Sequence, residues 1–148
     1  MTLKSSGIRN LGLCFQMHVP LTWNTNVNDE KSDHNAFLER LNKLKDEDIE
    51  VHITELDVRI PEPATYAEKL RQADIYEDIL QICLDAENCK AFVTWGFTDL
   101  HSWVPDISRS MDNPWPECQE AGCESALIFD EIYQPKPAYN SIKELLEQ

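Results

Sequence analysis

The sequence predicts an α/β fold built on a parallel sheet. Three β-prone segments alternate with helical patterns in the order strand, helix, strand, helix, strand, and one more helical segment lies near the C-terminus. Regular alternation of this kind is typical of parallel strands joined by right-handed helical crossovers. Two carboxylates interrupt the middle strand, 51–59.

Length and charge limit what the chain can be. Its 148 residues suffice for the core of one domain. The net charge of −14 disfavours nucleic acid and anionic membranes as partners, because both favour basic patches, whereas a neutral sugar is compatible with it. No run approaches the ~20 apolar residues of a membrane span, and we expect no secretory signal within this chain.

The first strand, 11–19, has two different sides. Its apolar side, expected to face helices, consists of Leu11, Leu13, Phe15, Met17 and Val19. Gln16 and His18 share the other side with Cys14 and point into an interior or a cleft. A strand histidine can be structural, but His18 lies beside Gln16 at the C-terminal end of the strand, which favours function. Cys14, within an apolar run, is expected to be a small buried thiol.

Helical periodicity defines the connections between the strands. The first helix is centred on 37–44, with Ser32 or Asp33 as its N-cap. The second, 65–86, opens on a capping box, a threonine and a glutamate three residues apart. The last helix covers about 137–146 and begins on a proline, which suits the first turn.

The middle strand carries Glu55 and Asp57. Acidic residues are rare in strands because a buried carboxylate must find hydrogen bonds or a charge partner. The period of two places both on one side of the strand. One interpretation makes Glu55 an edge charge or a salt-bridge partner of a helix. The other places it at the C-terminal end of a barrel strand, pointing into a substrate cleft.

The third strand, 91–95, is followed by about thirty residues without periodicity. Segments of this length within compact domains are usually functional or disordered. Exposed aromatic rings bind sugars because the apolar face of a pyranose packs on an indole. Trp95 and Trp103 lie near the strand end, which favours binding. Trp115 could equally serve to tie the segment down.

The five cysteines include two closely spaced pairs. Cys83 with Cys89, and Cys118 with Cys123, are close enough for local disulfides, which would indicate an oxidising compartment. Zinc bound by the second pair and His101 is the alternative, although one Cys-x4-Cys with a distant histidine makes a poor four-ligand site.

Four motifs occur in an order and at intervals that resemble one known family. They are Phe15-Gln16-Met17-His18, Ile53-Thr54-Glu55-Leu56-Asp57, the run from Trp95 to Trp103, and Leu127-Ile128-Phe129-Asp130 with the run from Tyr133 to Tyr139. They resemble the sixth, seventh and eighth strands and the entry to the last helix of glycoside hydrolase family 10, chiefly endo-1,4-β-xylanases. Four motifs at matching intervals carry more weight than any one of them.

The resemblance implies a partial (β/α)8 TIM barrel, roughly strands six to eight with their helices. Residues 1–148 would then be the C-terminal part of a single catalytic domain. It implies Glu55 as the nucleophile of a retaining glycosidase, His18 as its hydrogen-bond partner, and Asp57 as the support of the imidazole. The residues that it implies for lining the sugar site are Gln16, Trp95 and Trp103.

The resemblance also implies partners and chemistry. The parent activity would be hydrolysis of xylan with retention, by a secreted enzyme that needs no cofactor or metal. Fungal members carry cysteines at a spacing similar to that of Cys83 and Cys89, so we expect this pair to form a disulfide between the end of one helix and the next strand.

Two departures from the family pattern limit these expectations. Such barrels need roughly 250 residues or more, whereas this chain shows only three strands. The family's acid/base glutamate follows an asparagine, and no Asn-Glu pair occurs in the sequence. We therefore expect the chain alone to be inactive, and to be poorly soluble, to self-associate through open barrel edges or to need the missing half. The alternatives are a non-catalytic carbohydrate-binding remnant, or the same barrel acting on another β-1,4-glycan. The segment 105–125, longer than the family's short forms, leaves the outline of the leaving-group side open.

Overall fold

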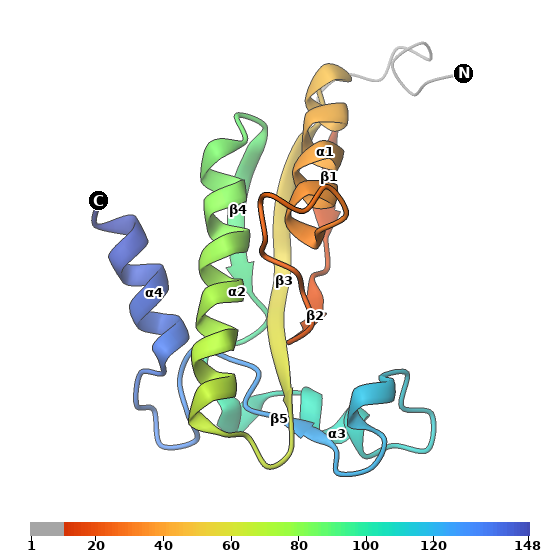
Figure 1. Cartoon of the computed structure of the whole chain (residues 1–148), viewed down its shortest axis with the longest axis vertical. Coiled ribbons are helices and arrows are strands. Elements are labelled where there is room, and N and C mark those ends of the chain that lie inside the picture. The colour runs from red at the N-terminus through yellow and green to blue at the C-terminus, as the bar shows by residue number, and fades with distance from the viewer. Residues whose placement is uncertain (1–10) are drawn as a thin grey trace.

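The computed structural model describes residues 11–148 and has the predicted alternation of strands and helices (Figure 1). The strands and helices are β1 (Gly12–Phe15), β2 (His18–Pro20), α1 (Asp33–Asp46), β3 (Glu50–Pro61), α2 (Tyr66–Asp85), β4 (Cys89–Thr94), η2 (Asp99–His101), α3 (Val104–Ser108), η3 (Pro116–Cys118), β5 (Cys123–Glu124) and α4 (Pro137–Leu146). No helix of the described residues is long and apolar enough to cross a membrane.

The sheet is centred on β3, its longest strand. β1 runs parallel to the first half of β3, from Gly12 opposite Glu50, and β2 runs parallel to the second half, with His18 opposite Asp57. β1 and β2 therefore act as one strand that is broken between Phe15 and His18. β4 lies parallel to β3 on its other flank, and β5 adds a short antiparallel pair at the end of β3 (Figure 1).

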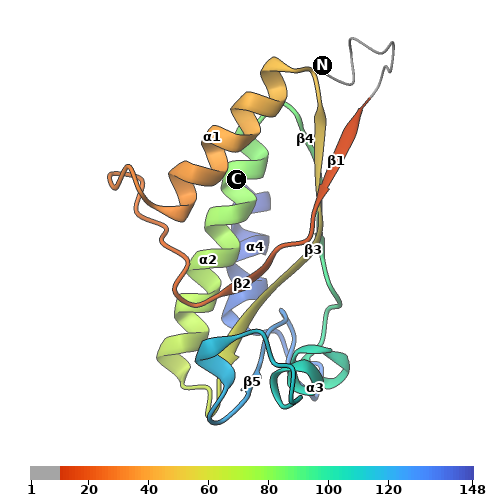
Figure 2. The ribbon, with the colours of Figure 1, turned by 90° about the vertical axis from the view of Figure 1, so that its right-hand side faces the viewer.

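The helices α1, α2 and α4 cover one face of this sheet, as the view along the sheet shows (Figure 2). The side chains of β3 that face them are fully buried: Val51, Ile53, Leu56, Val58 and Ile60. The first four belong to one core cluster with Ile75, Tyr76 and Ile79 of α2, and each such burial contributes about 1.5–3 kcal/mol. The helix-facing residues of β3 are two positions apart except between Ile53 and Leu56, which are three apart. The pairing of β3 with β4 shifts register at that point.

The prediction that Cys14 is buried is wrong. Its thiol is exposed, and Leu13 beside it is 42% exposed. Within the described residues β1 has a strand neighbour only on the β3 side, so an apolar pattern that would be buried in a closed sheet is here partly exposed to water.

Several predicted local features occur in the structure. Thr65 and Glu68 form the capping box at the start of α2. Cys83 is bonded to Cys89, and Cys118 to Cys123. Because the last two cysteines are bonded to each other, the zinc site with His101 is wrong. The aperiodic stretch after β4 contains only short elements: η2, α3, η3 and β5.

A buried ion pair fixes the chain beyond β4. Lys136 Nζ lies 2.8 Å from Asp99 Oδ2 and also donates to the Ser125 carbonyl at 2.6 Å, and Asp99 Oδ1 accepts from the Leu127 amide. Burial lowers the pKa of Lys136 and raises that of Asp99, and the attraction between the two opposes both shifts. The pair thereby ties η2 to the start of α4.

We expect Lys136→Met to cost about 3–5 kcal/mol of unfolding free energy, because it leaves the Asp99 carboxylate buried without its cation. Urea titration followed by circular dichroism measures the loss. Lys143→Met, which removes an exposed pair with Glu147, is the matched control and should cost less than ~0.5 kcal/mol. Equal costs for the two variants would contradict a structural role of the buried pair.

Candidate active site

The C-terminal half of β3 presents Glu55 and Asp57 on the face away from the helices. Leu56, between them, is fully buried on the helix side. The parallel register brings His18 of β2 opposite Asp57, and Gln16, in the break between β1 and β2, reaches Glu55. Residues about forty positions apart in the sequence thus meet because two parallel strands end at the same edge of the sheet.

The Glu55 carboxylate lies between two nitrogen-bearing side chains. Gln16 Nε2 donates to Oε1 at 2.7 Å, and His18 Nε2 lies 3.4 Å from Oε2. Hydrogen bonds to a carboxylate favour its charged form. Each oxygen of Glu55 therefore faces a group that can stabilise the negative charge.

Asp57 is the buried anchor of the site. Its Oδ2 accepts from His18 Nδ1 at 2.8 Å and from the indole Nε1 of Trp103 at 2.8 Å. The residue is 0% exposed, and its Oδ1 has no hydrogen-bond partner among residues 11–148. A carboxylate in this position must keep its two donors, which holds the His18 imidazole and the Trp103 indole in place.

The pKa of His18 is raised above its ordinary 6.5. Partial burial of the ring acts to lower the pKa, but the hydrogen bond and charge of Asp57, followed by those of Glu55, outweigh it. The imidazolium is thus retained to higher pH than in an exposed histidine. In that form Nδ1 donates to Asp57, while Nε2 carries a proton toward Glu55.

Two indole rings border the carboxylates. The ring of Trp103, which precedes α3, has its centroid 4.7 Å from the His18 ring at an interplanar angle of 60°. Trp95, which follows β4, lies 6.5 Å from the same ring and is 46% exposed. All six residues predicted for the site therefore lie at one end of the strands: Gln16, His18, Glu55, Asp57, Trp95 and Trp103.

Arg59 is a supporting residue that the sequence analysis missed. It is buried, donates to the His18 carbonyl at 2.8 Å, and pairs with Glu117 of η3 at 2.7 Å. Its guanidinium lies 4.5 Å above the ring of Trp115, whose ring packs edge-on to Trp103 at 5.6 Å. Trp115 thus ties the segment down. The period of two that links Glu55 to Asp57 continues to Arg59, and this pattern could have revealed it.

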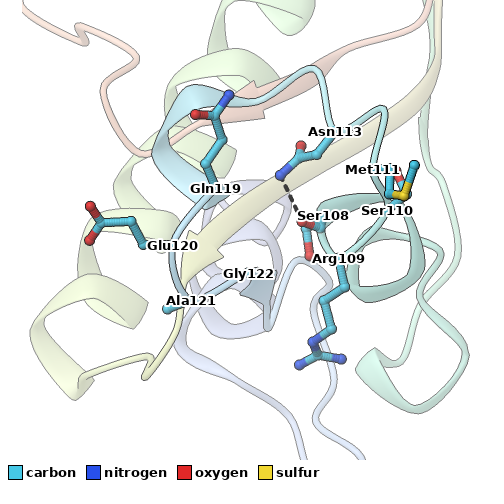
Figure 3. Close-up of a pocket in the computed structure, with 9 residues that line it drawn as sticks. All are labelled: Ser108, Arg109, Ser110, Met111, Asn113, Gln119, Glu120, Ala121 and Gly122. Atoms are coloured by element: carbon cyan, nitrogen blue, oxygen red, sulfur yellow. Dashed lines mark hydrogen bonds between the residues drawn. The ribbon is translucent and has the colours of Figure 1, made fainter.

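A cavity of about 440 Å³ lies outside this site, in the segment 105–125 (Figure 3). Its lining has no aromatic ring and consists of Ser108, Arg109, Ser110, Met111, Asn113, Gln119, Glu120, Ala121 and Gly122. Asn113 Nδ2 donates to the Ser108 carbonyl at 2.6 Å across it. Sugar sites combine apolar ring faces with a few polar groups, so this cavity does not fit a sugar as well as the strand ends do.

The chain shows no candidate for metal chemistry in its described part. Among residues 11–148, no group of three or more histidine, cysteine, aspartate or glutamate side chains is placed to hold a metal ion.

Comparisons with known proteins give consistent results. The family model for glycosyl hydrolase family 10 matches residues 1–145. Endo-1,4-beta-xylanase B of Thermotoga neapolitana is 35% identical over 147 residues, which are 99% of this chain and 37% of that protein. Endo-1,4-beta-xylanase A of Fusarium oxysporum f. sp. lycopersici is 32% identical over 139 residues.

Solved structures show the same likeness. Xylanase 10B of Thermotoga petrophila RKU-1, solved in complex with xylobiose, superposes with a TM-score of 0.78 at 37% identity, covering 98% of this chain and 38% of that one. Native xylanase 10B of Thermotoga maritima gives a TM-score of 0.78 at 36% identity, covering 98% and 39%. The chain thus spans about two fifths of the length of these similar proteins.

The raised pKa of His18 has a consequence for stability. A histidine whose pKa is higher in the folded state stabilises the fold fully below its unfolded pKa of ~6.5 and loses this contribution as pH rises through the folded value. We expect Asp57→Asn to lower the pKa of His18 by removing its main charge partner, measured by NMR titration of the imidazole. The His18→Gln variant lacks the imidazole signal of His18 and thereby identifies it in the NMR spectrum. An unchanged His18 pKa in Asp57→Asn would contradict the coupling.

Proposed function

The chain belongs to glycosyl hydrolase family 10, and from this we propose that it supplies the nucleophile-bearing part of a retaining endo-1,4-β-xylanase, with Glu55 as the nucleophile. The proposed partner is a neutral polysaccharide, xylan or a xylo-oligosaccharide. The proposal rests above all on the Glu55 carboxylate, which is held between Gln16 and His18 at the end of β3.

In the proposed reaction, Glu55 attacks the anomeric carbon and forms a glycosyl ester while the glycosidic C–O bond breaks and the leaving oxygen takes a proton from a general acid. Water then hydrolyses the ester. The nucleophile must be ionised, and the Gln16 amide and the His18 imidazole face its two oxygens. When the ester forms, the negative charge leaves Glu55, and Gln16 and His18 still hold the carboxyl group in place.

Asp57 would act through His18. The hydrogen bond at 2.8 Å fixes Nδ1 as the nitrogen that faces Asp57, so Nε2 is the one that faces Glu55. Trp103 donates to the same oxygen and is thereby oriented as a wall of the site. The half-exposed ring of Trp95 offers an apolar surface to the sugar.

We propose that the described residues do not supply the general acid. Retaining hydrolysis needs a second carboxyl about 5–5.5 Å from the nucleophile. Asp57 is unsuitable because it is buried and its Oδ2 already holds two donors. The first ten residues contain no aspartate or glutamate.

Glu124 has one property of a general acid but the wrong location. Burial, and then the neighbouring charge and hydrogen bond of Glu62, raise its pKa. It pairs with Ile60, however, five residues beyond Glu55 along β3. At a rise of ~3.3 Å per residue this is about 16 Å from the nucleophile, too far for it to protonate the leaving oxygen.

Two alternative functions are also compatible with the site. The exposed ring of Trp95 also suits a non-catalytic carbohydrate-binding remnant, and the same barrel type could act on another β-1,4-glycan. Binding of xylohexaose without turnover in any completed barrel would favour the first alternative. Faster turnover of glucan than of xylan would favour the second.

The two disulfides fit an oxidising compartment, which supports a secreted parent enzyme.

We expect the 148-residue chain alone to hydrolyse neither xylan nor an aryl xylobioside at measurable rates. Without a general acid, catalysis of this kind typically loses 10²–10⁴-fold, and the open site adds to the loss. The measurement is release of reducing sugar and of the aryl group by the purified chain. Turnover at ordinary glycosidase rates that Glu55→Ala abolishes would contradict this expectation.

We expect Glu55→Ala to abolish turnover in a barrel completed with the remainder of a relative, and azide to restore part of it. Azide can enter the space left by the carboxylate and attack the anomeric carbon, giving the inverted glycosyl azide on the activated aryl substrate. Glu62→Ala is the control and should retain most of the activity. Near-normal hydrolysis by Glu55→Ala would refute the assignment of the nucleophile.

A further inference from the structure

A second, smaller core lies beside the candidate site. Its members are fully or partly buried: Val104, Cys118, Cys123, Ala126, Trp103 and Trp115. Neither cysteine of this core is exposed, and the two are bonded to each other. We call residues 115–123 the disulfide loop. The loop therefore has a core of its own, separate from the larger core between the sheet and the helices.

The end of the disulfide loop is fixed to the sheet and to α3. Cys123 of β5 lies opposite Pro61 of β3. Its amide donates to the Ser108 hydroxyl at 2.9 Å, and that hydroxyl donates to the Cys123 carbonyl at 3.1 Å. Because Cys118 is bonded to Cys123, these contacts also limit the movement of η3.

Arg59 is the residue at which the disulfide loop meets the strands. Its Nε and Nη2 each lie 2.7 Å from Oε1 of Glu117, and its guanidinium carbon lies 4.5 Å from the centre of the Trp115 ring. Arg59 is only 6% exposed, and a buried cation is costly without its carboxylate. A planar guanidinium can serve a carboxylate, an aromatic ring and a carbonyl at once, which a lysine ammonium cannot. The loop therefore controls where the Arg59 side chain lies.

Two routes lead from the loop to the imidazole of His18. In the first, Arg59 Nη1 donates to the His18 carbonyl at 2.8 Å, which adds a side-chain bond to β2, a strand of only three residues. In the second, the Trp115 ring packs edge-on against Trp103 at 5.6 Å. The Trp103 ring lies 4.7 Å from the imidazole and donates to Asp57. Both routes end at the hydrogen-bonded pair of His18 and Asp57.

We infer that Trp115 and Glu117 are positioning residues of the candidate site, and that the disulfide of their loop keeps them in place. Glu117 acts through Arg59 on the backbone of His18, and Trp115 acts on the imidazole through the indole beside it. Neither has to touch the sugar. The inference deepens the proposed function, on which its catalytic meaning rests, whereas the effect on His18 can be measured without turnover.

The test measures the coupling between His18 and Asp57 in the 148-residue chain. NMR titration gives the amount by which Asp57→Asn lowers the pKa of His18, and this amount depends on how closely the imidazole is held to the carboxylate. We expect Glu117→Ala and Trp115→Ala each to reduce it by about half or more in a double-mutant cycle. Glu117→Gln keeps an acceptor for Arg59 and should retain most of it.

The two disulfides provide a matched comparison. Cys118→Ser with Cys123→Ser opens the disulfide loop, and Cys83→Ser with Cys89→Ser opens the bond between α2 and β4. The bonded cysteines are 5 and 6 residues apart in sequence, so the two double variants should lose similar stability in urea. Only the first should weaken the coupling.

The side chain of Glu117 is 28% exposed, so its variants keep the test available if the cysteine variants unfold. The inference is overturned by a coupling that no loop variant reduces, by the absence of the coupling from the parent chain, or by equal reductions in the two cysteine variants.

Kinetics in a barrel completed with the remainder of a relative give the catalytic readout. Glu117→Ala should lower kcat by about tenfold and leave KM nearly unchanged, because the loop orients the site without binding the sugar. A change in KM alone would overturn the positioning role. A completed barrel without turnover would contradict the proposed function, and the coupling measured in the 148-residue chain would still decide the inference.

Discussion

The buried carboxylate of Asp57 is the constraint on which the candidate site depends. It is fully buried, and an anion in that position is tolerated only when donors face it. The two donors come from distant parts of the chain, His18 from β2 and the Trp103 indole from the segment after β4. Because each must reach the same oxygen, the strand register and the path of that segment are fixed together. The geometry around Glu55 follows from this arrangement.

Charged groups hold the surrounding segments in a similar way. Arg59 connects the His18 carbonyl to Glu117, and Lys136 with Asp99 connects η2 to α4. Neither connection contacts Glu55. Glu117, Asp99 and Lys136 lie on chain segments that have little regular structure, so polar contacts take the place of helix and strand packing there. This explains why a stretch of thirty aperiodic residues holds an aromatic wall in position.

The sequence predicts the regular elements and the grouping of the polar residues well, because both follow from local periods. A period of two and a parallel register suffice to bring Gln16 and His18 toward Glu55 and Asp57. The exposure of Cys14 could not be predicted, since it depends on which strands flank β1. The role of Trp115 was also undetermined. It is decided by a contact with Arg59, fifty-six positions earlier in the chain, which no local pattern encodes.

The exposed thiol of Cys14 makes the state of the sheet edge chemically observable. The other four cysteines are in disulfides, so a thiol-specific reagent has a single target atom in the native chain. Cys14 lies in the outermost strand, two residues before Gln16. Its alkylation rate therefore depends on whether that edge is covered, and a small spectroscopic label at this sulfur would report closure of the interior without any substitution in the protein.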